Sequence, residues 1–196
     1  MEFRKLYQTF EPSQRVQQDR KRVQENMQFI VDRAYRGHVK IHVELFGSSI
    51  NNLGFSTSDV DICLRIPQSH GLDEDEFARL TNMFRLANIL RRFGMQDVRP
   101  VASARVPICK FVHPETGLQC DANFGNELGV KNSLLLRTYT LIDPRVRPLV
   151  MLVKNWAKNR DLNDAADGGT ITSYAYSLMV LNFLQIRGII PSLQEL

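Results

Sequence analysis

The hydrophobic pattern of the first 45 residues predicts a long helix followed by a strand. Between residues 12 and 36 apolar side chains recur at spacings of 7, 4, 3 and 4, which places them on one stripe of a helix, and Pro12 suits its first turn. The stripe consists of Val16, Val23, Met27, Ile30 and Ala34. From Val39 to Leu45 the period changes to two, as in a strand. This strand runs into the small residues Gly47 and Ser48, after which we expect a short helix or turn.

The rest of the chain continues with strands and then turns helical. Alternation predicts a second strand over residues 59–64, and a helical stripe over residues 73–94 begins at a capping Asp73 and stops at Gly94. Three further strands are predicted at 97–103, 105–112 and 118–124. Beyond Asn126 the pattern is helical, with breaks near Asp143-Pro144, Gly168-Gly169, Gly188 and Pro191. The predicted fold class is α+β, a mixed sheet with helices wrapped around it.

The composition is that of a globular protein with a core of its own. Of the 196 residues, 43% are hydrophobic, which suits one domain or one domain with part of another. No apolar run approaches the roughly 20 residues that cross a bilayer, and the N-terminal sequence lacks the apolar centre of a signal peptide. Three scattered cysteines indicate reduced thiols, and the four histidines show no zinc-type spacing with them. We therefore expect no membrane partner and a cytoplasmic or nuclear location.

The basic residues are unevenly distributed along the chain. The net charge is only +4, but residues 131–160 carry seven basic residues against one acid, a regional charge of +6. A solvated helix face and a face that binds a polyanion both explain such a run.

The stretch FGSSINNLGFSTSDVDICL, residues 46–64, contains the first candidates for chemistry. On a strand, Asp59 and Asp61 project to the same side, while Val60 and Ile62 point into the core. Two neighbouring carboxylates repel each other, and a divalent cation such as Mg²⁺, which prefers hard oxygen ligands, relieves that repulsion. Because an exposed strand end can carry Asp-x-Asp by chance, the pair alone leaves both interpretations open.

Two further features favour a phosphate site with a metal beside it. Gly47 and Ser48 precede a predicted helix start, where free backbone N–H groups favour phosphate, although an ordinary turn has the same residues. Asp121 lies on a later strand between Cys120 and Ala122 and could supply the third carboxylate that two-metal phosphoryl transfer uses. As a lone acid it is equally compatible with the rim of a sheet.

These motifs carry a resemblance to a known family. Gly47-Ser48, then Asp59-Val60-Asp61, then a distant strand with Asp121 resembles the signature of the DNA polymerase β-like nucleotidyltransferases. Four longer segments are similar to the non-canonical poly(A) polymerase and terminal uridylyltransferase family, the Cid1-type enzymes: ARVPICKF, CDANFGNELGVKNSLLLRTYT, RVRPLVMLVKNWAKNRDLN and GTITSYAYSLMVLNFLQ. The resemblance covers nearly the whole chain from about residue 41 onward.

The resemblance implies a domain organisation. A mixed-sheet polymerase β-like nucleotidyltransferase domain, residues 38–125, is expected to be flanked by a helical domain formed by residues 1–37 and 126–196. The family's base-recognition loop has no equivalent before Leu196, so we expect the helical domain to be incomplete. Without that loop, the expected nucleotide substrate is UTP or ATP.

The resemblance also implies roles for the carboxylates and the Gly-Ser turn. Asp59 and Asp61 would bind both metal ions, Mg²⁺ or Mn²⁺. Asp121 would bind the catalytic ion and help to deprotonate the RNA 3′-hydroxyl that attacks the α-phosphate, with pyrophosphate leaving. Gly47 and Ser48 would hold the outer phosphates.

Five residues of the helical part match nucleotide contacts of the family. Asn132 would contact the ribose hydroxyls, and a helix cap is its alternative role. Lys154 and Lys158, like charges four apart on a helix, would bind the triphosphate, with a solvated pair as the alternative. Ser173 and Tyr174 would contact the triphosphate and stack on the base, although a tyrosine in an apolar helix is more often a core residue.

For the chain as a whole, the resemblance implies an enzyme that adds UMP or AMP to an RNA 3′ end without a template. Arg105 and Lys110 would touch the RNA strand, and we expect a monomer. The alternative is a catalytically silent relative that binds RNA or scaffolds partners, which the presence of all three carboxylates and the Gly-Ser pair disfavours.

Overall fold

A five-stranded mixed sheet organises the first two thirds of the chain. The computed structural model describes residues 2–36, 39–67, 72–163 and 169–194. The strands follow the spatial order β1-β2-β5-β4-β3: β1 (His42–Phe46), β2 (Val60–Arg65), β5 (Gln119–Phe124), β4 (Ile108–Val112) and β3 (Gln96–Val101). The β2 and β5 strands pair in parallel and every other pair is antiparallel. The predicted mixed sheet is confirmed, and the fold is that of an α+β protein.

Helices fill both the N-terminal segment and the region after β5. The helical elements are α1 (Glu2–Phe10), α2 (Gln14–Ala34), the single 3₁₀ turn η1 (Gly47–Ser49), α3 (Glu74–Leu80), α4 (Met83–Arg92), α5 (Glu127–Ile142), α6 (Val146–Lys158) and α7 (Ser173–Ile186). The break predicted at Gly168 lies outside the described residues. Of the helices that the structure describes, none combines the length and the apolar content that a bilayer crossing requires.

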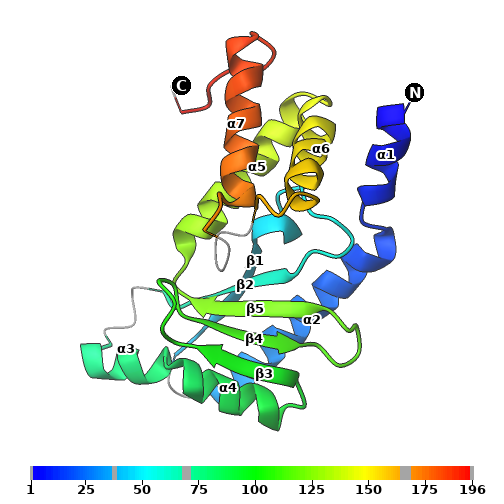
Figure 1. The fold of residues 1–196 in the computed structure, drawn as a ribbon. Helices are drawn as coiled ribbons and strands as arrows, with labels where there is room; N and C mark the ends of the chain where they lie inside the picture. The colour runs from blue at the N-terminus through cyan, green and yellow to red at the C-terminus, as the bar shows by residue number, and fades with distance from the viewer. Residues whose placement is uncertain (1, 37–38, 68–71, 164–168, 195–196) are drawn as a thin grey trace.

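The main core lies between the sheet and the helices α2 and α4. Val60 and Ile62 of β2 are fully buried against Met27 and Ile30 of α2 and Leu86 of α4. Figure 1 shows α2 crossing behind the strands. The alternation of β2 thus sends its apolar side chains towards the helices and leaves its acidic side chains on the opposite face. The predicted apolar stripe on α2 therefore packs on the sheet. The division of the chain into a nucleotidyltransferase domain and a helical domain stays a prediction.

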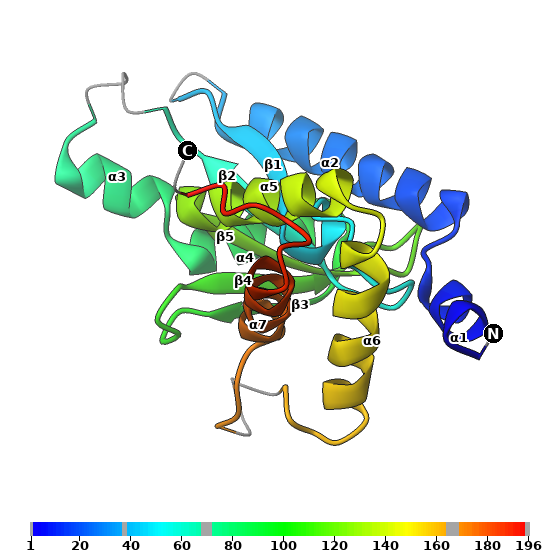
Figure 2. The ribbon, with the colours of Figure 1, turned by 90° about the horizontal axis from the view of Figure 1, so that it is seen from above.

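A second core joins the helices that follow the sheet. Leu136 of α5, Val150 of α6 and Leu181 of α7 are buried together, and Phe10 of α1 packs against them. Figures 1 and 2 show α5, α6 and α7 gathered beyond one end of the sheet. Leu53, from the connection between β1 and β2, is buried in this cluster, so the connection links the sheet to the helical layer.

Two local predictions need correction, and one helix was not predicted. The stripe predicted over residues 73–94 is two helices, because the Asn82 side chain accepts from the backbone N–H groups of Phe84 and Arg85 and starts α4 anew. Pro12 precedes α2 and does not form its first turn, since Ser13 is the N-cap and accepts from Val16 N. The segment before Pro12, which carried no predicted element, forms α1.

All three cysteines are buried free thiols, as predicted. Cys63 lies on β2, Cys109 on β4 and Cys120 on β5. Burial raises the pKa of Cys109 to about 11 and that of Cys120 to about 12. These thiols act as small core side chains and are poor nucleophiles.

Candidate active site

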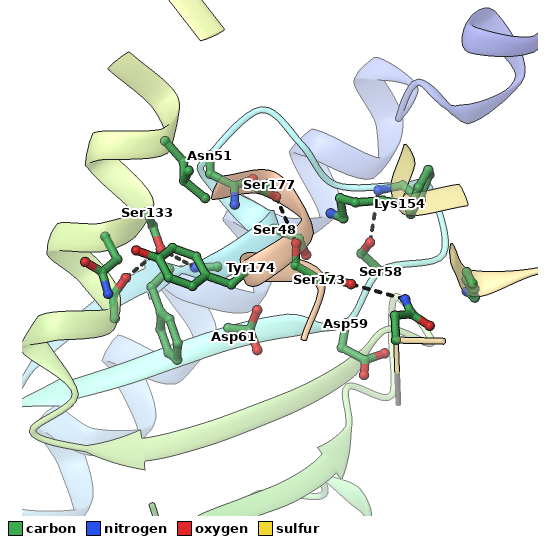
Figure 3. A pocket seen from close by; sticks show the side chains of 18 of the residues that line it. Ser48, Asn51, Ser58, Asp59, Asp61, Ser133, Lys154, Ser173, Tyr174 and Ser177 are labelled. Carbon is green, nitrogen blue, oxygen red and sulfur yellow. Dashed lines mark hydrogen bonds between the residues drawn. The ribbon is translucent and has the colours of Figure 1, made fainter. Parts of the chain in front are cut away.

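A cavity of about 520 Å³ lies where the helical layer meets the sheet. Its size is in the range of small-molecule sites. Figure 3 shows side chains entering it from the β1–β2 connection, from β2 and from the helices above. It is lined by nine of the predicted site residues: Gly47, Ser48, Asp59, Asp61, Asn132, Lys154, Lys158, Ser173 and Tyr174. The fold therefore brings together residues up to about 130 positions apart in the sequence.

The three aspartates lie side by side on neighbouring strands. Asp61 of β2 is directly opposite Asp121 of β5 in the parallel register, and Asp59 precedes β2 by one residue. Asp59 and Asp61 line the cavity (Figure 3). Asp121 stands beside it, and its Oδ2 accepts a 2.7 Å hydrogen bond from Lys110 Nζ, the residue opposite it on β4. Lys110, Asp121 and Asp61 thus form one row across three strands.

Burial and mutual repulsion disfavour the ionised form of the paired carboxylates. Burial, followed by the charges of Asp121 and Asp59, raises the pKa of Asp61 to about 7, against the lowering effects of a hydrogen bond from the Ser48 backbone and of Lys110. Burial and then Asp121 raise the pKa of Asp59 as well. Bound positive charge would reverse both effects, because an adjacent cation favours the ionised form.

This donor set fits a hard divalent cation. Carboxylate oxygens are the ligands that Mg²⁺ prefers, and Asp59 and Asp61 both present theirs to the cavity. Lys110 donates one hydrogen bond to Oδ2 of Asp121, which leaves the Asp121 carboxylate lone pairs with which it could bind a cation. Across the described part of the chain, no three acidic, histidine or cysteine side chains already converge on one point as a finished metal site.

The Gly-Ser turn is held from two sides. Gly47 has a φ of +60°, and its N–H donates to Ser133 Oγ at 2.7 Å, while Ser133 Oγ donates to Gly129 O at 2.6 Å. The Ser48 backbone lowers the pKa of the Asp61 carboxyl. The expectation of free N–H groups at this turn is therefore wrong for Gly47, since the Ser133 side chain of α5 already engages its N–H. The Ser48 side chain still lines the cavity.

Ser133→Ala is expected to lower the free energy of unfolding by about 1–2 kcal/mol, because it leaves the half-buried Gly47 N–H without its partner. Chemical denaturation of the wild type and the variant measures this loss. Thr138→Ala is the matched control: Thr138 makes the same bond to the carbonyl four residues earlier on α5, to Leu134 O at 3.0 Å, but faces solvent. Equal losses in the two variants would contradict a special role for Ser133.

Lys154 and Lys158 occupy different environments although they share a helix. Lys154 is 6% exposed; its Nζ donates to Leu53 O at 2.6 Å and lies 5.3 Å from the centre of the Phe55 ring. Burial lowers the pKa of Lys154 to about 8, with Asp61 acting in the opposite direction. Lys158 is exposed at the cavity. The alternative of a solvated pair is wrong for Lys154, which ties α6 to the β1–β2 connection.

The other nucleotide-contact candidates face the same cavity. Asn132 of α5 lines it without capping that helix, whose N-cap is Asn126. Ser173 begins α7, and its Oγ accepts from Asn163 Nδ2 at 3.2 Å. Tyr174 is 37% exposed and is not a core residue; Figure 3 shows its ring in front of the cavity.

The two candidates for RNA contact lie away from the cavity lining. Arg105 is exposed in the connection between β3 and β4, and Lys110 is engaged with Asp121. They share the β3–β4 side of the sheet, which leaves their role as RNA contacts a prediction.

Sequence reasoning missed several small polar residues of the site. Asn51, Ser58, Ser133, Asn163 and Ser177 also line the cavity. Ser177 was detectable in part: it is a hydroxyl in the apolar α7, four residues after Ser173, to whose carbonyl it donates at 2.9 Å. Ser133 gave no such signal, because its partner Gly47 is 86 residues away in the sequence.

A known family has the same sequence features. The profile described as "Poly(A) RNA polymerase, mitochondrial-like, central palm domain" matches residues 1–141. The chain belongs to this family. The predicted resemblance is thereby confirmed, and the sheet, the η1 turn and the three aspartates described above all fall inside the matched region of this central palm.

Individual relatives agree with this assignment. The chain is 38% identical over 194 residues to poly(A) RNA polymerase cid11 of Schizosaccharomyces pombe, covering 98% of this chain and 39% of that protein. It is also 38% identical over 194 residues to human terminal uridylyltransferase 7, covering 97% of this chain and 12% of that protein. A crystal structure of mtPAP in complex with CTP superposes with a TM-score of 0.84 at 29% identity, over 99% of this chain and 44% of that one. The chain thus spans less than half the length of these relatives.

Proposed function

We propose that this palm performs RNA 3′-terminal nucleotidyl transfer: it joins AMP or UMP, from ATP or UTP, to an RNA 3′-hydroxyl without a template and releases pyrophosphate. The observation that carries the proposal is the row formed by Asp61 and Asp121 in parallel register, with Asp59 two residues before Asp61, beside a nucleotide-sized cavity. The family and the relatives named poly(A) RNA polymerase and terminal uridylyltransferase support it.

The carboxylates would hold divalent cations, for which Mg²⁺ and Mn²⁺ are both suitable. Bound there, such ions supply Lewis-acid stabilisation of the attacking and leaving oxygens. Asp59 and Asp61 present carboxylate oxygens at the cavity wall, and Asp121, opposite Asp61 on the neighbouring strand, would help to accept the proton of an incoming 3′-hydroxyl. Lys110 keeps the Asp121 carboxylate oriented through its hydrogen bond to Oδ2.

The opposite side of the cavity would bind the nucleotide. Lys158 and the Ser48 and Ser173 hydroxyls are the groups that can hold the phosphates, Asn132 can contact the ribose, and Tyr174 offers an aromatic face to a base. Lys154 also lines the cavity; because its Nζ is bonded to Leu53 O, it would act on the phosphates through its charge.

Incorporation of nucleotides into a labelled RNA oligonucleotide tests this function. We expect the chain to extend an RNA with a 3′-hydroxyl when ATP or UTP and Mg²⁺ or Mn²⁺ are present, and to leave the same RNA with a 3′-deoxy end unextended. Chelation of the metal should stop the reaction. RNA binding without extension under any of these conditions would instead support the catalytically silent alternative. The cytoplasmic location, the monomeric state and the RNA contacts of Arg105 and Lys110 stay predictions.

Nucleotide binding at pH 8.5 is expected to take up a proton at Lys154. The pKa of this buried ammonium is about 8 in the free protein, and a bound triphosphate raises it by favouring the charged form. Titration calorimetry in two buffers of different ionisation enthalpy measures the uptake. At pH 8.5 Asp61, with a pKa of about 7, is already ionised and contributes little. Uptake that persists in Lys154→Met would contradict the assignment.

A further inference from the structure

A second, smaller pocket lies on the opposite side of the loop that carries Ser48. This pocket, the back pocket, has a volume of about 230 Å³. It is formed by the first half of α2, by residues 47–54, which follow β1 and are called the η1 loop, and by the facing parts of α5 and α6. Its lining includes Ser49, Ile50, Asn52 and Gly54 of the loop, and it shares only Ser48 with the candidate active site. The loop therefore forms a wall between two cavities.

The charges that line this back pocket are all positive. Arg20 and Lys21 come from α2, Arg137 from α5 and Arg147 from α6, and no aspartate or glutamate belongs to the lining. These helices are far apart in the sequence, so the clustering is a product of the fold. Like charges brought this close repel one another, and an anion between them would relieve that cost.

Neighbouring acids compensate two of the four cations. Arg147 Nη1 lies 2.6 Å from Glu11 Oε1, and Lys21 Nζ lies 3.6 Å from Glu25 Oε1 in an exposed pair. Arg20 and Arg137 form no salt bridge with any residue that the structure describes. Two guanidinium groups of the pocket thus lack a direct ionic partner among the described residues, and Asp61 acts on Arg20 without forming a salt bridge.

Arg20 is a buried cation in the lining of the pocket. Only 5% of this residue is exposed; Nη2 donates to Phe55 O at 2.9 Å, but the buried Nε has no hydrogen-bond partner among the described residues. A buried donor without an acceptor is costly, and for a charged group the cost is higher. Because Nε itself is inaccessible from the pocket, an anion bound there would act on Arg20 through the charge of its guanidinium group.

We propose that this back pocket binds a phosphate group. Planar guanidinium groups such as those of Arg20 and Arg137 match the oxygens of phosphate. The Asn52 amide donates one N–H to Thr140 Oγ1 at 3.2 Å, and its second N–H can add a neutral donor. A volume of about 230 Å³ suits a phosphate or pyrophosphate and is too small for a whole nucleotide. The phosphate belongs either to a free small anion or to the backbone of an RNA strand that passes over the pocket. Binding there needs neither the three aspartates nor catalysis.

Pyrophosphate titration tests the pocket directly. All titrations use the chain with Lys158→Gln and a chelator, which weakens competing phosphate binding in the candidate active site. We expect Arg137→Gln to weaken pyrophosphate binding about tenfold, because it removes one charge-assisted contact. Arg137 is exposed on α5, so the variant should fold normally. Arg33→Gln, which removes an exposed cation of α2 outside the pocket, is the control and should bind like its parent.

Amide chemical shifts locate the bound anion. The proposal expects the shifts of Ser49 and Ile50 to move on titration and those of Asn132 and Ser177 to stay. A parallel titration with a short single-stranded RNA identifies the source of the phosphate: weaker RNA binding by Arg137→Gln indicates a backbone phosphate, and an effect on pyrophosphate alone indicates a free anion. Equal affinities of Arg137→Gln and Arg33→Gln for both ligands, or shifts confined to Asn132 and Ser177, would overturn the proposal.

Discussion

Asp61→Asn is expected to slow nucleotidyl transfer by about 10³-fold or more, equivalent to about 4 kcal/mol of transition-state stabilisation. The same variant should make the metal-free protein more stable at alkaline pH. Asparagine is neutral, keeps an oxygen that can accept from the Ser48 backbone, and removes the repulsion with Asp121 and Asp59. Single-turnover extension of RNA and thermal unfolding in a chelator measure the two effects.

The stability gain has a defined pH dependence. The folded-state pKa of Asp61, about 7, lies above its usual value of 3.8, so the folded protein binds more protons between these values and loses stability as the pH rises through them. The loss is complete above pH 7 and amounts to on the order of 4 kcal/mol. Asp61→Asn should therefore exceed the wild type in stability at pH 8 and match it near pH 4.

A control substitution separates this effect from general loss of charge. Asp32→Asn replaces an exposed aspartate of α2 that lies outside the cavity and should leave both transfer and stability close to those of the wild type. An Asp61→Asn protein that retains transfer, or that is no more stable than the wild type at pH 8, would refute the assignment of Asp61 as a buried metal ligand.

Gly47→Ala is expected to disrupt the site through its backbone conformation and through its contact with Asp61. Gly47 has a φ of +60°, a conformation that costs a residue with a Cβ about 1–2 kcal/mol. A Cβ at this position would also overlap Oδ2 of Asp61 and lie 2.9 Å from its Cγ. Either the η1 turn or the Asp61 side chain must move, so we expect nucleotide binding and transfer to fall at least about a hundredfold together with stability.

Gly117→Ala isolates the backbone contribution. Gly117, in the β4–β5 turn, has a similar φ of +69°, but a Cβ there would meet nothing within 4 Å. It should lose about 1–2 kcal/mol of unfolding free energy and keep its transfer rate. Denaturation curves and extension assays on both variants test this. If Gly47→Ala lost no more activity than Gly117→Ala, close packing of the turn against Asp61 would be unimportant.

The sheet and its acidic residues could be predicted because their signals are local. Alternation over residues 59–64 fixes which side chains of β2 face the core, and so directs Asp59 and Asp61 to the other face. The break between α3 and α4 was missed because the apolar stripe continues across Asn82, whose capping bonds outweigh it. The family resemblance supplied Asn132, Ser173 and Tyr174, whose residue types alone gave no indication of a site.

The sequence by itself determined the strands, the order of the motifs and the three carboxylates, since each depends on periodicity or on residues close in the chain. Only the tertiary structure decided how these groups are held. Ser133 reaches Gly47 across 86 residues and Lys154 reaches Leu53 across 101. It also gathers Arg20 and Arg137 behind the η1 loop. Burial, pKa and charge clustering depend on which elements pack together, and hydrophobic periodicity specifies a face of each element but not its partner.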